Sequence, residues 1–414
     1  MLTDERRRPL GDLDPAESRH NWARSAATVA DGTVVAGGVG GRLTAERPDA
    51  TPAERWSTTA ADPSAIVDSY VVSLAARDGT LVAGERGPDG HVAALSAATG
   101  DRRWRYATAA DVGTATTESL TFQPYVVDVA VGGRTVAAAR RYDRDGESRD
   151  WSSVVLGFDP DGDVRWRYPA RAAPLALDAR HSRVAVAYNR CTDAHAHGLV
   201  VLDADTGAPV MNWDPGTEGD RRVGDVAFLG DGVAVASHGD KHGYLLDADG
   251  GERWRVDLAS ERRVGGETVY AYPTHVRAAG DAAVFVTGNT YAESTRDPDA
   301  RHPREHTIAA VDDGDLTWTH PVGGFARDVA ADGSLVAVPS AQHFRERRAD
   351  THAVHLFDAD RGHLDSRSIP GIAAAVALDG DTLAVVEEPV EYHDEGVTHG
   401  AFRLHTWRVD ADER

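Results

Sequence analysis

Short apolar runs alternate with polar turns along the whole chain, and residues 199–213 give the clearest copy of this pattern. Residues 199–202 (Leu-Val-Val-Leu) are apolar, residues 203–207 (Asp-Ala-Asp-Thr-Gly) favour a turn, and a second run continues to Trp213. Two such runs joined by such a turn predict a β-hairpin. Gly207 is expected to take the positive φ that closes the turn.

Weaker copies of this hairpin recur, and most of them end on a tryptophan. A second pair of short apolar runs lies upstream of each hairpin, as in residues 223–237. Eight such upstream pairs are counted at an average spacing of about fifty residues, which is typical of four-stranded propeller blades. The sequence therefore predicts an all-β fold, a single β-propeller of eight blades, with seven as the alternative. The repeat tryptophans are Trp104, Trp166, Trp213, Trp254 and Trp318, with degenerate ends at Trp56 and Trp407 and with Ser366 in place of one tryptophan; the structural turn glycines are Gly100, Gly207 and Gly362.

A turn of the form Asp-x-x-Thr-Gly followed by a tryptophan resembles the PQQ-like repeat. This is the tryptophan-docking blade of quinoprotein dehydrogenases and of the outer-membrane assembly lipoprotein propeller, and the resemblance covers nearly the whole chain. Residues 94–104 keep the spacing from turn glycine to tryptophan with threonine present, although Ser96 replaces the aspartate. The resemblance implies that each tryptophan docks between neighbouring blades, as a large aromatic ring on an outer strand does physically. It extends at the level of architecture to WD40/YVTN-like propellers, and it predicts fold rather than function.

The propeller is predicted over residues 21–414, after a charged lead-in over residues 1–20 that is expected to be flexible or peripheral. A strand near Asn21 and Trp22 could complete the last blade, but Trp407 already supplies that blade with an outer strand. No apolar run reaches the ~18 residues of a transmembrane helix, and no signal-peptide core precedes the repeats. The chain is therefore expected to be cytoplasmic, without membrane insertion.

The composition is strongly acidic. Asp and Glu number 66 against 44 Lys and Arg, the net charge is −22, and Lys241 is the single lysine. A dense carboxylate surface keeps a protein hydrated and dispersed when salt screens charge, so we expect a salt-adapted, haloarchaeal-like cell. The same balance argues against nucleic acid, whose phosphates require a concentrated basic patch.

Histidines gather in the connections between the second and third strands of the predicted blades. Short loops can turn imidazole, thiolate and carboxylate ligands inward together, which suits zinc or copper. No connection reproduces a known metal signature, and ordinary surface histidines are the alternative. The weak metal candidates are Cys191, His195 and His197 in one connection, and His238, Asp240 and His242 in the next. Later connections carry His302, Glu305 and His306, then His343 and His352, then His393, Asp394, Glu395 and His399.

No catalytic motif accompanies the repeat. The resemblance to quinoprotein dehydrogenases would imply an adjacent Cys-Cys disulfide, a calcium ion held by Glu, Asn and Asp, and a catalytic aspartate. Cys191 is the only cysteine, so that disulfide cannot form. The sequence has no nucleophile elbow, phosphate loop or dinucleotide fingerprint. We therefore expect no catalytic residues, no cofactor and, in particular, no PQQ.

Connections on one side of each predicted blade are short, whereas those between the second and third strands are mostly long. The two sets must lie on opposite faces, because strand direction alternates within a blade. Off-repeat aromatic side chains in the long set are typical of contact residues. We expect a non-catalytic binding or scaffolding propeller that uses this long-loop face for protein partners; the alternative is a metal-dependent or hydrolytic enzyme with its site at the central channel mouth. The long connections are residues 140–151, 189–198, 288–306, 341–352 and 388–400, and the partner-binding candidates are Tyr142, Trp151, Tyr291, His302, His306, Phe344, Arg345 and Tyr392.

Overall fold

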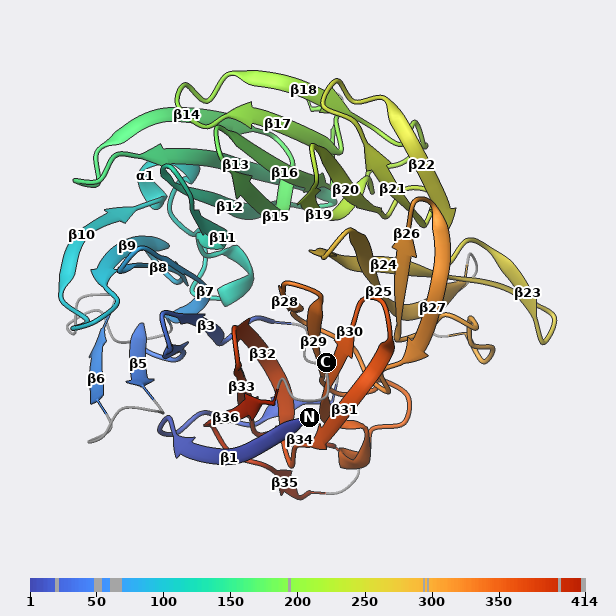
Figure 1. Cartoon of the computed structure of the whole chain (residues 1–414). Helices are drawn as coiled ribbons and strands as arrows, with labels where there is room; N and C mark the ends of the chain where they lie inside the picture. The colour runs from blue at the N-terminus through green and yellow to red at the C-terminus, as the bar shows by residue number, and fades with distance from the viewer. Residues whose placement is uncertain are drawn as a thin grey trace. The chain divides into compact units, whose positions relative to one another are not determined.

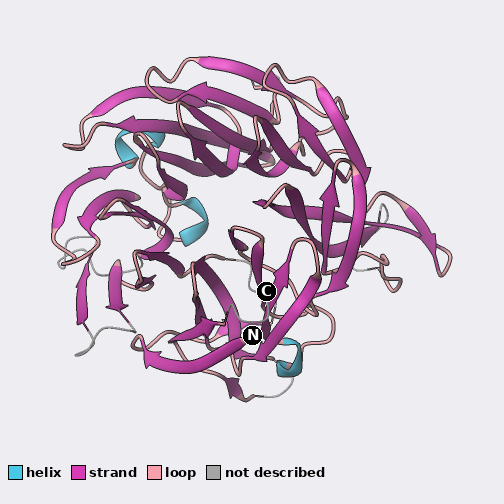
Figure 2. Ribbon diagram, in the orientation of Figure 1, coloured by secondary structure: helices cyan, strands magenta, loops and turns pink. Residues whose placement is uncertain are grey.

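The structure is a computed structural model, and it describes residues 1–18, 22–47, 54–59, 69–192, 195–292, 295, 298–393 and 396–410, without the side chains of residues 54, 55 and 148. Asn21, Asp394 and Glu395 lie outside the described residues. Strands dominate the described chain and the helices are short (Figure 1; Figure 2). The chain forms two compact units, Arg24–Val223 and Met1–Ala23 with Gly224–Arg414, and each unit is described by itself. The predicted all-β propeller fold of four-stranded blades is confirmed, while the number of blades stays a prediction.

In the unit Arg24–Val223, the strands of each blade follow one another in chain order. The first sheet contains β3 (Ala26–Ala30), β4 (Thr33–Gly37), β5 (Arg42–Arg47) and β6 (Glu54–Thr59). The next two blades are β7 (Tyr70–Arg77), β8 (Thr80–Arg86), β9 (His91–Ser96) and β10 (Arg102–Ala107), then β11 (Tyr125–Val131), β12 (Thr135–Asp145), β13 (Ser148–Phe158) and β14 (Val164–Ala170). They share one sheet through the pairing of Tyr125 with Arg86, with α1 (Ala109–Val112) and the 3-10 turn η2 (Leu120–Phe122) between them. The unit ends with β15 (Ala173–Arg180), β16 (Arg183–Asn189), β17 (Leu199–Asp203) and β18 (Pro209–Trp213).

The other unit repeats the arrangement. One blade contains β19 (Val223–Leu229), β20 (Gly232–Ser237), β21 (His242–Leu246) and β22 (Glu252–Asp257). The next contains β24 (Glu267–Ala279), β25 (Ala282–Ala292), β26 (Thr307–Asp312) and β27 (Asp315–Pro321), with β23 (Arg262–Val264) added at the β24 edge. A third contains β28 (Ala330–Asp332), β29 (Leu335–Ser340), β30 (Ala353–Asp358) and β31 (Gly362–Ser368), with the 3-10 turn η3 (Ala349–Thr351) before β30.

The last blade of this unit is completed from the start of the chain. Its strands are β32 (Ile372–Asp379), β33 (Thr382–Glu388), β36 (Arg403–Val409) and, outermost, β1 (Leu2–Pro9), which runs antiparallel to β36 from Leu2↔Val409 to Pro9↔Arg403. A small sheet contains β2 (Ala16–Glu17), which follows β1, and β34 (Val390–Glu391) and β35 (Thr398–His399), which lie in the connection between β33 and β36.

These strands correct the expectation of a flexible lead-in over residues 1–20 and of an outer strand at Trp407. β1 is charged because an outermost strand exposes most of its side chains, so its composition looks like that of a coil; Leu2 is its buried anchor. Trp407 lies on the third strand of its blade and is itself buried, so it belongs to the core and is not a repeat tryptophan.

The predicted tryptophan docking is confirmed within the units. Trp166 on β14 donates its indole N–H to the carbonyl of Ala204, 2.8 Å away, in the turn between β17 and β18. Gly207 in that turn has φ +70°, and a Cβ there would lie 2.5 Å from the Trp166 ring, so only glycine fits. The same close contact recurs between Trp56 and Gly100, Trp104 and Gly162, and Trp254 and Gly314, where a Cβ would lie 2.4–2.9 Å from the tryptophan. Trp318 also faces a turn glycine, Gly362, but with more room, since a Cβ there would lie 3.8 Å away.

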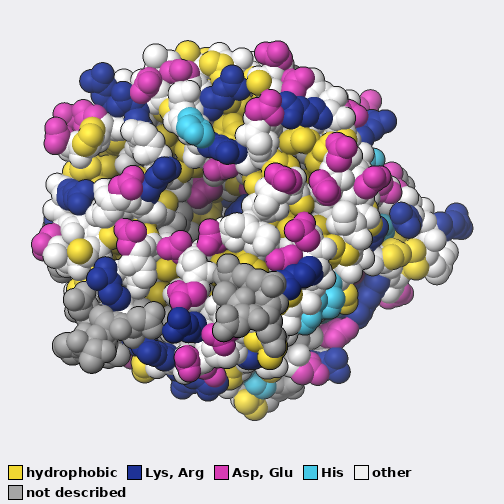
Figure 3. All heavy atoms as spheres, in the orientation of Figure 1, with side chains coloured by type: hydrophobic (Ala, Val, Ile, Leu, Met, Phe, Trp, Pro, Cys, Tyr) yellow, Lys and Arg dark blue, Asp and Glu magenta, His cyan; other side chains and the backbone are white. Residues whose placement is uncertain are grey.

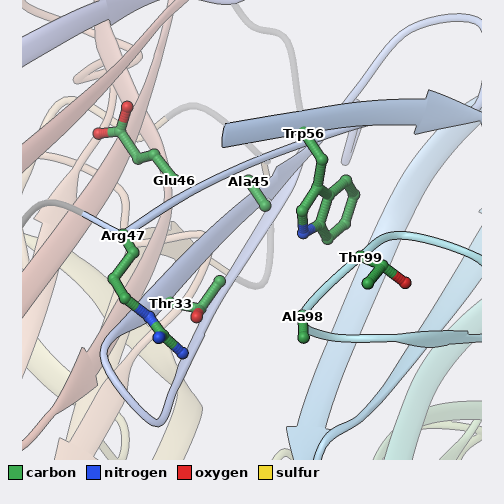
Figure 4. Close-up of a pocket in the computed structure, with 7 residues that line it drawn as sticks. All are labelled: Thr33, Ala45, Glu46, Arg47, Trp56, Ala98 and Thr99. Atoms are coloured by element: carbon green, nitrogen blue, oxygen red, sulfur yellow. The ribbon is translucent and has the colours of Figure 1, made fainter. Parts of the chain in front are cut away.

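A pocket of about 360 Å³ lies beside one of these docked rings. Figure 4 shows Trp56 of β6 next to Ala98 and Thr99 of the turn between β9 and β10. The indole N–H of Trp56 donates to the Ala97 carbonyl at 3.1 Å. The pocket is thus bordered by the residues that dock one blade against the next.

The expected long connection 140–151 is instead a continuous hairpin. β12 and β13 stay paired from Thr135↔Phe158 out to Asp145↔Ser148. The outer half of this hairpin is largely polar, so its sequence lacks the apolar alternation that predicts a strand. Tyr270 and Tyr272 lie on a second extended hairpin, in which β24 pairs with β25 out to Val269↔Ala292.

Candidate functional site

The first group of sequence-predicted metal ligands, in the connection before β17, does not assemble around one point. His195 is buried with its ring 4.4 Å from that of Tyr188, whereas His197 is exposed. Burial raises the pKa of the Cys191 thiol to about 12, which disfavours the thiolate that metals bind. Among the described residues, these three side chains do not bring their ligand atoms together.

The second group, His238, Asp240 and His242, is engaged in its own loop. Asp240 accepts a hydrogen bond from the Tyr244 hydroxyl, and its backbone carbonyl lies 2.8 Å from Nδ1 of His242. The His238 ring packs 4.9 Å from that of Tyr272. Within the described chain, this group does not form a metal-ligand cluster either.

The connections after β25 and after β29 carry the same motif at the same place in adjacent blades. Residues 302–306 read His-Pro-Arg-Glu-His and residues 343–347 read His-Phe-Arg-Glu-Arg. In each, Nδ1 of the leading histidine accepts the amide hydrogen of the residue two positions on, at 3.1 Å for His302 and 3.3 Å for His343. The fifth residue of each has a positive φ, 47° in the first and 50° in the second. The two connections therefore share one local conformation.

The two motifs are tied to each other by ion pairs. Arg301 lies 2.8 Å from Glu346 of the other motif, and Arg345 lies 4.0 Å from Glu305. Arg345 also donates to the carbonyl of Ala300 at 3.3 Å. The two connections therefore contact each other directly. We call residues 301–306 and 343–348 the paired loops.

The paired loops bring together Glu305, His306 and His343, whose ligand atoms all lie within 4.8 Å of one another. The rings of His306 and His343 are nearly perpendicular, with centroids 4.7 Å apart, and Nε2 of His343 is 3.5 Å from Oε1 of Glu305. Nε2 of His306 lies 2.9 Å from Oδ1 of Asn289. Nδ1 of His306 is buried and has no hydrogen-bond partner among the described residues.

This cluster borders a pocket of about 470 Å³. Burial, followed by His343 and Arg301, lowers the pKa of His306 to about 3, so its imidazole is neutral at physiological pH. The hydrogen bond from Arg301 lowers the pKa of Glu346, which keeps that carboxylate charged. The pocket is lined by Arg301, His302, Glu305, His306, Pro321, Val322, Gly323, His343, Glu346, Arg348, Asp350, Thr351, Ala353 and His355.

Sequence reasoning noted Glu305 and His343 but did not select them as metal candidates. Spacing within one connection was the criterion, and these two residues come from different connections. The recurrence of His-x-Arg-Glu in two adjacent blades is the sequence signal that could have found them.

Among the partner-binding candidates, Tyr291 lies in a cluster of partly exposed tyrosines. It pairs with Tyr270 across β24 and β25, and its ring centroid is 6.1 Å from that of Tyr270 and 5.3 Å from that of Tyr272. Nζ of Lys241 lies 4.8 Å from the Tyr270 ring centroid. We call Tyr270, Tyr272 and Tyr291 the tyrosine cluster.

The other candidates divide by exposure. Tyr142 and Trp151 are partly exposed and pack against each other with tilted rings, whose centroids are 4.6 Å apart, across β12 and β13. Phe344 packs 5.8 Å from Phe325 and is also partly exposed, like Arg345. His302, His306 and Tyr392 are buried, which contradicts their expected role as surface contacts; the Tyr392 hydroxyl lies 2.5 Å from Nε2 of His352.

Comparison with solved structures supports the fold. BamB from Moraxella catarrhalis is 16% identical with a TM-score of 0.56, over 99% of this chain and 100% of that one. The quinohemoprotein alcohol dehydrogenase of Comamonas testosteroni is 14% identical with a TM-score of 0.58, over 100% of this chain and 77% of that one. The C-terminal WD40 domain of Sif2 is 10% identical with a TM-score of 0.55, over 98% and 99%. The sequence matches no protein-family model and no curated protein.

Together, the repeat, the docked tryptophans and these neighbours define the chain as a β-propeller with the PQQ-like repeat fold. Identities this low establish the fold alone. In the described part of the chain, no helix has the length and apolar character needed to span a membrane.

Proposed function

We propose that this protein is a non-catalytic binding or scaffolding propeller that uses its long-loop face for protein partners. The observation that carries the proposal is the tyrosine cluster, three partly exposed rings gathered on the extended hairpin of β24 and β25. Tyrosines supply a large contact area with a polar tip at low cost in conformational entropy, and they are enriched where proteins bind one another.

The surroundings of the cluster favour a partner that is polar at its rim. Lys241 over Tyr270 also lies 3.2 Å from Glu261, so both charge signs border the aromatic rings. The paired loops, in the same unit, are held by Arg301–Glu346 and need little ordering on binding, which lowers the entropic cost of association. BamB and the WD40 domain have the same architecture, which is compatible with a binding role and does not identify the partner.

Affinity capture from the native organism at high salt tests this proposal. We expect a reproducible protein partner whose capture is lost when Tyr270, Tyr272 and Tyr291 are all changed to serine. The matched control is Tyr142→Ser with Trp151→Ser, which removes the other exposed aromatic pair. Capture that survives loss of the tyrosine cluster would place the interface elsewhere and contradict the proposal.

We further propose that the protein works in the cytoplasm of a salt-adapted cell. The net charge of −22 supports this, since its self-repulsion destabilises the compact state when little salt is present. In Figure 3, acidic side chains are spread over the visible face with arginines between them. Thermal unfolding followed from dilute to molar KCl should show a rising midpoint, and a flat response would remove the support for salt adaptation.

A further inference from the structure

We propose that Glu305, His306 and His343 form a binding site for a divalent transition-metal cation of the Zn²⁺ type. Two imidazoles and one carboxylate are the donor set that such ions prefer over the all-oxygen sites of calcium and magnesium. The site lies between the paired loops and does not depend on the proposed protein partner.

His306 is prepared as a ligand by its own hydrogen bond. Nε2 of His306 faces the amide oxygen of Asn289 at 2.9 Å, and an oxygen only accepts, so Nε2 carries the proton. Nδ1 therefore bears the lone pair. This atom is buried and has no hydrogen-bond partner among the described residues, which is costly unless something fills the position. A cation would satisfy it, and Asn289 would orient the ring.

Glu305 has one oxygen held and the other directed into the cluster. Oε2 accepts a hydrogen bond from the Thr290 hydroxyl and lies 4.0 Å from Arg345. Thr290 is itself fixed, since its oxygen accepts the backbone N–H of His302 at 3.0 Å. Oε1 faces His343, so the carboxylate is oriented to give one oxygen to a cation.

The separation of Glu305 and His343 fits two ligands of one ion. Their facing atoms are 3.5 Å apart, too far for a strong hydrogen bond. Two atoms bound tetrahedrally at about 2.1 Å from an ion lie about 3.4 Å apart. Nδ1 of His343 accepts the amide hydrogens of Arg345 at 3.3 Å and Glu346 at 3.2 Å, so Nε2 carries the proton. Binding must move this proton to Nδ1 as those long contacts lengthen.

Nearby arginines are compensated by carboxylates. Arg301 and Arg348 both pair with Glu346, at 2.8 Å and 3.0 Å. Another guanidinium, that of Arg345, lies on the Oε2 side of Glu305, away from the oxygen that faces His343. Three protein ligands beside a pocket of about 470 Å³ leave room for water or a small ligand in a fourth position.

The test is titration of the chelator-treated full chain with Zn²⁺ alone, followed by calorimetry at neutral pH. We expect one high-affinity equivalent, and Co²⁺ should give a tetrahedral visible spectrum that Zn²⁺ displaces. Mg²⁺ should give neither signal. These readouts do not require any activity or partner.

Glu305→Gln, His306→Gln and His343→Gln should each weaken Zn²⁺ binding at least tenfold, and Asn289→Ala should weaken it by roughly ten- to a hundredfold through loss of ring orientation. His242→Gln is the control, because it removes a sequence-predicted candidate outside the cluster. Circular dichroism of each variant tests folding, and the conservative Glu305→Asp keeps a carboxylate in case Glu305→Gln unfolds. The proposal is overturned if the wild type takes up no Zn²⁺, or if binding persists in the three ligand variants and falls in His242→Gln.

Discussion

The turn that docks Trp166 and the paired loops show two ways of joining adjacent blades. At the turn, one indole ring packs on Gly207 and donates to the Ala204 carbonyl, and similar contacts recur in other blades. At the paired loops, Arg301 meets Glu346, and Glu305, His306 and His343 converge once. The repeated docking contacts supply stability, whereas the cluster of Glu305, His306 and His343, the one potential metal-ligand group among the described residues, is where chemistry can concentrate. The two regions should therefore differ in how mutation, pH and charge affect them.

The largest difference should come from removing a docked ring. Trp166→Ala should destabilise the protein by roughly 3–5 kcal/mol, because a large buried aromatic and its hydrogen bond are lost together. Denaturant unfolding measures the loss, with the partly exposed Trp151→Ala as the control of smaller effect. Equal losses in the two variants would show that docking has no special weight.

Adding a methyl group at the docking glycine should come next. Gly207→Ala combines a positive φ of 70° with a Cβ 2.5 Å from Trp166, for a cost of roughly 2–4 kcal/mol. Gly32→Ala is the matched control, since Gly32 has the same φ of +70° with nothing within 4 Å of the added atom. Its cost should be only about 1–2 kcal/mol. If both variants unfold at the same denaturant concentration, the contact with Trp166 contributes nothing.

Low pH should destabilise the connection after β29, which contains His352. It should have no comparable effect on the apolar docking turns. Burial lowers the pKa of His352 to about 4, against a carbonyl contact from Pro370 that raises it. Folding therefore favours the neutral imidazole of His352. Its contribution to the free energy of unfolding is complete above about pH 6.5 and is lost as the pH falls toward 4. The loss at pH 5 should be about 2 kcal/mol.

Unfolding curves from pH 7.5 to pH 4.5 would measure this effect in the wild type and in His352→Gln. The quantity to compare is the slope of the unfolding free energy against pH. The absolute stabilities are not comparable, because the substitution also alters the contact with Tyr392. The variant should lose part of the acid sensitivity. An unchanged slope would assign that sensitivity to other groups.

The smallest effect should be that of the ion pair between the paired loops. Arg301 and Glu346 are 47% and 27% exposed, so a double-mutant cycle of Arg301→Gln and Glu346→Gln should give a coupling of only about 0.2–1 kcal/mol. A coupling above about 2 kcal/mol would mean that these loops stabilise the blades as strongly as the tryptophans do.

The repeat made most of the fold predictable. The hairpin ending at Trp213 and the positive φ of Gly207 were inferred from apolar runs and turn residues, and the docking of the tryptophans was implied by the resemblance to the PQQ-like repeat. Strands without an apolar face escaped prediction. The outer parts of β12 and β13, and β1 apart from Leu2, are largely polar because solvent reaches them, and pattern alone cannot separate such strands from loops.

The candidate site was far less predictable. Spacing in a single loop selected Cys191, His195 and His197, but the Cys191 thiol is buried with a raised pKa and the His195 ring packs against Tyr188. Glu305 and His343 are thirty-eight positions apart, and only pairing of adjacent blades brings them within reach. Tyr392 was expected to contact a partner, but it is buried. An aromatic residue in a long connection can face inward as readily as outward, and the sequence pattern does not distinguish the two.

The pairing of β1 with β36 sets the order in which this protein can be made. Leu2 leaves the ribosome long before its partner Val409 is translated. Until then β36 does not exist, and β1 waits as a charged, unpaired segment whose Arg and Glu side chains keep it from joining other strands. Closing so long a stretch carries a large entropic cost, so this sheet should be the last to form. A ribosome stalled before β36 is translated would hold a chain in which β1 has no strand to pair with.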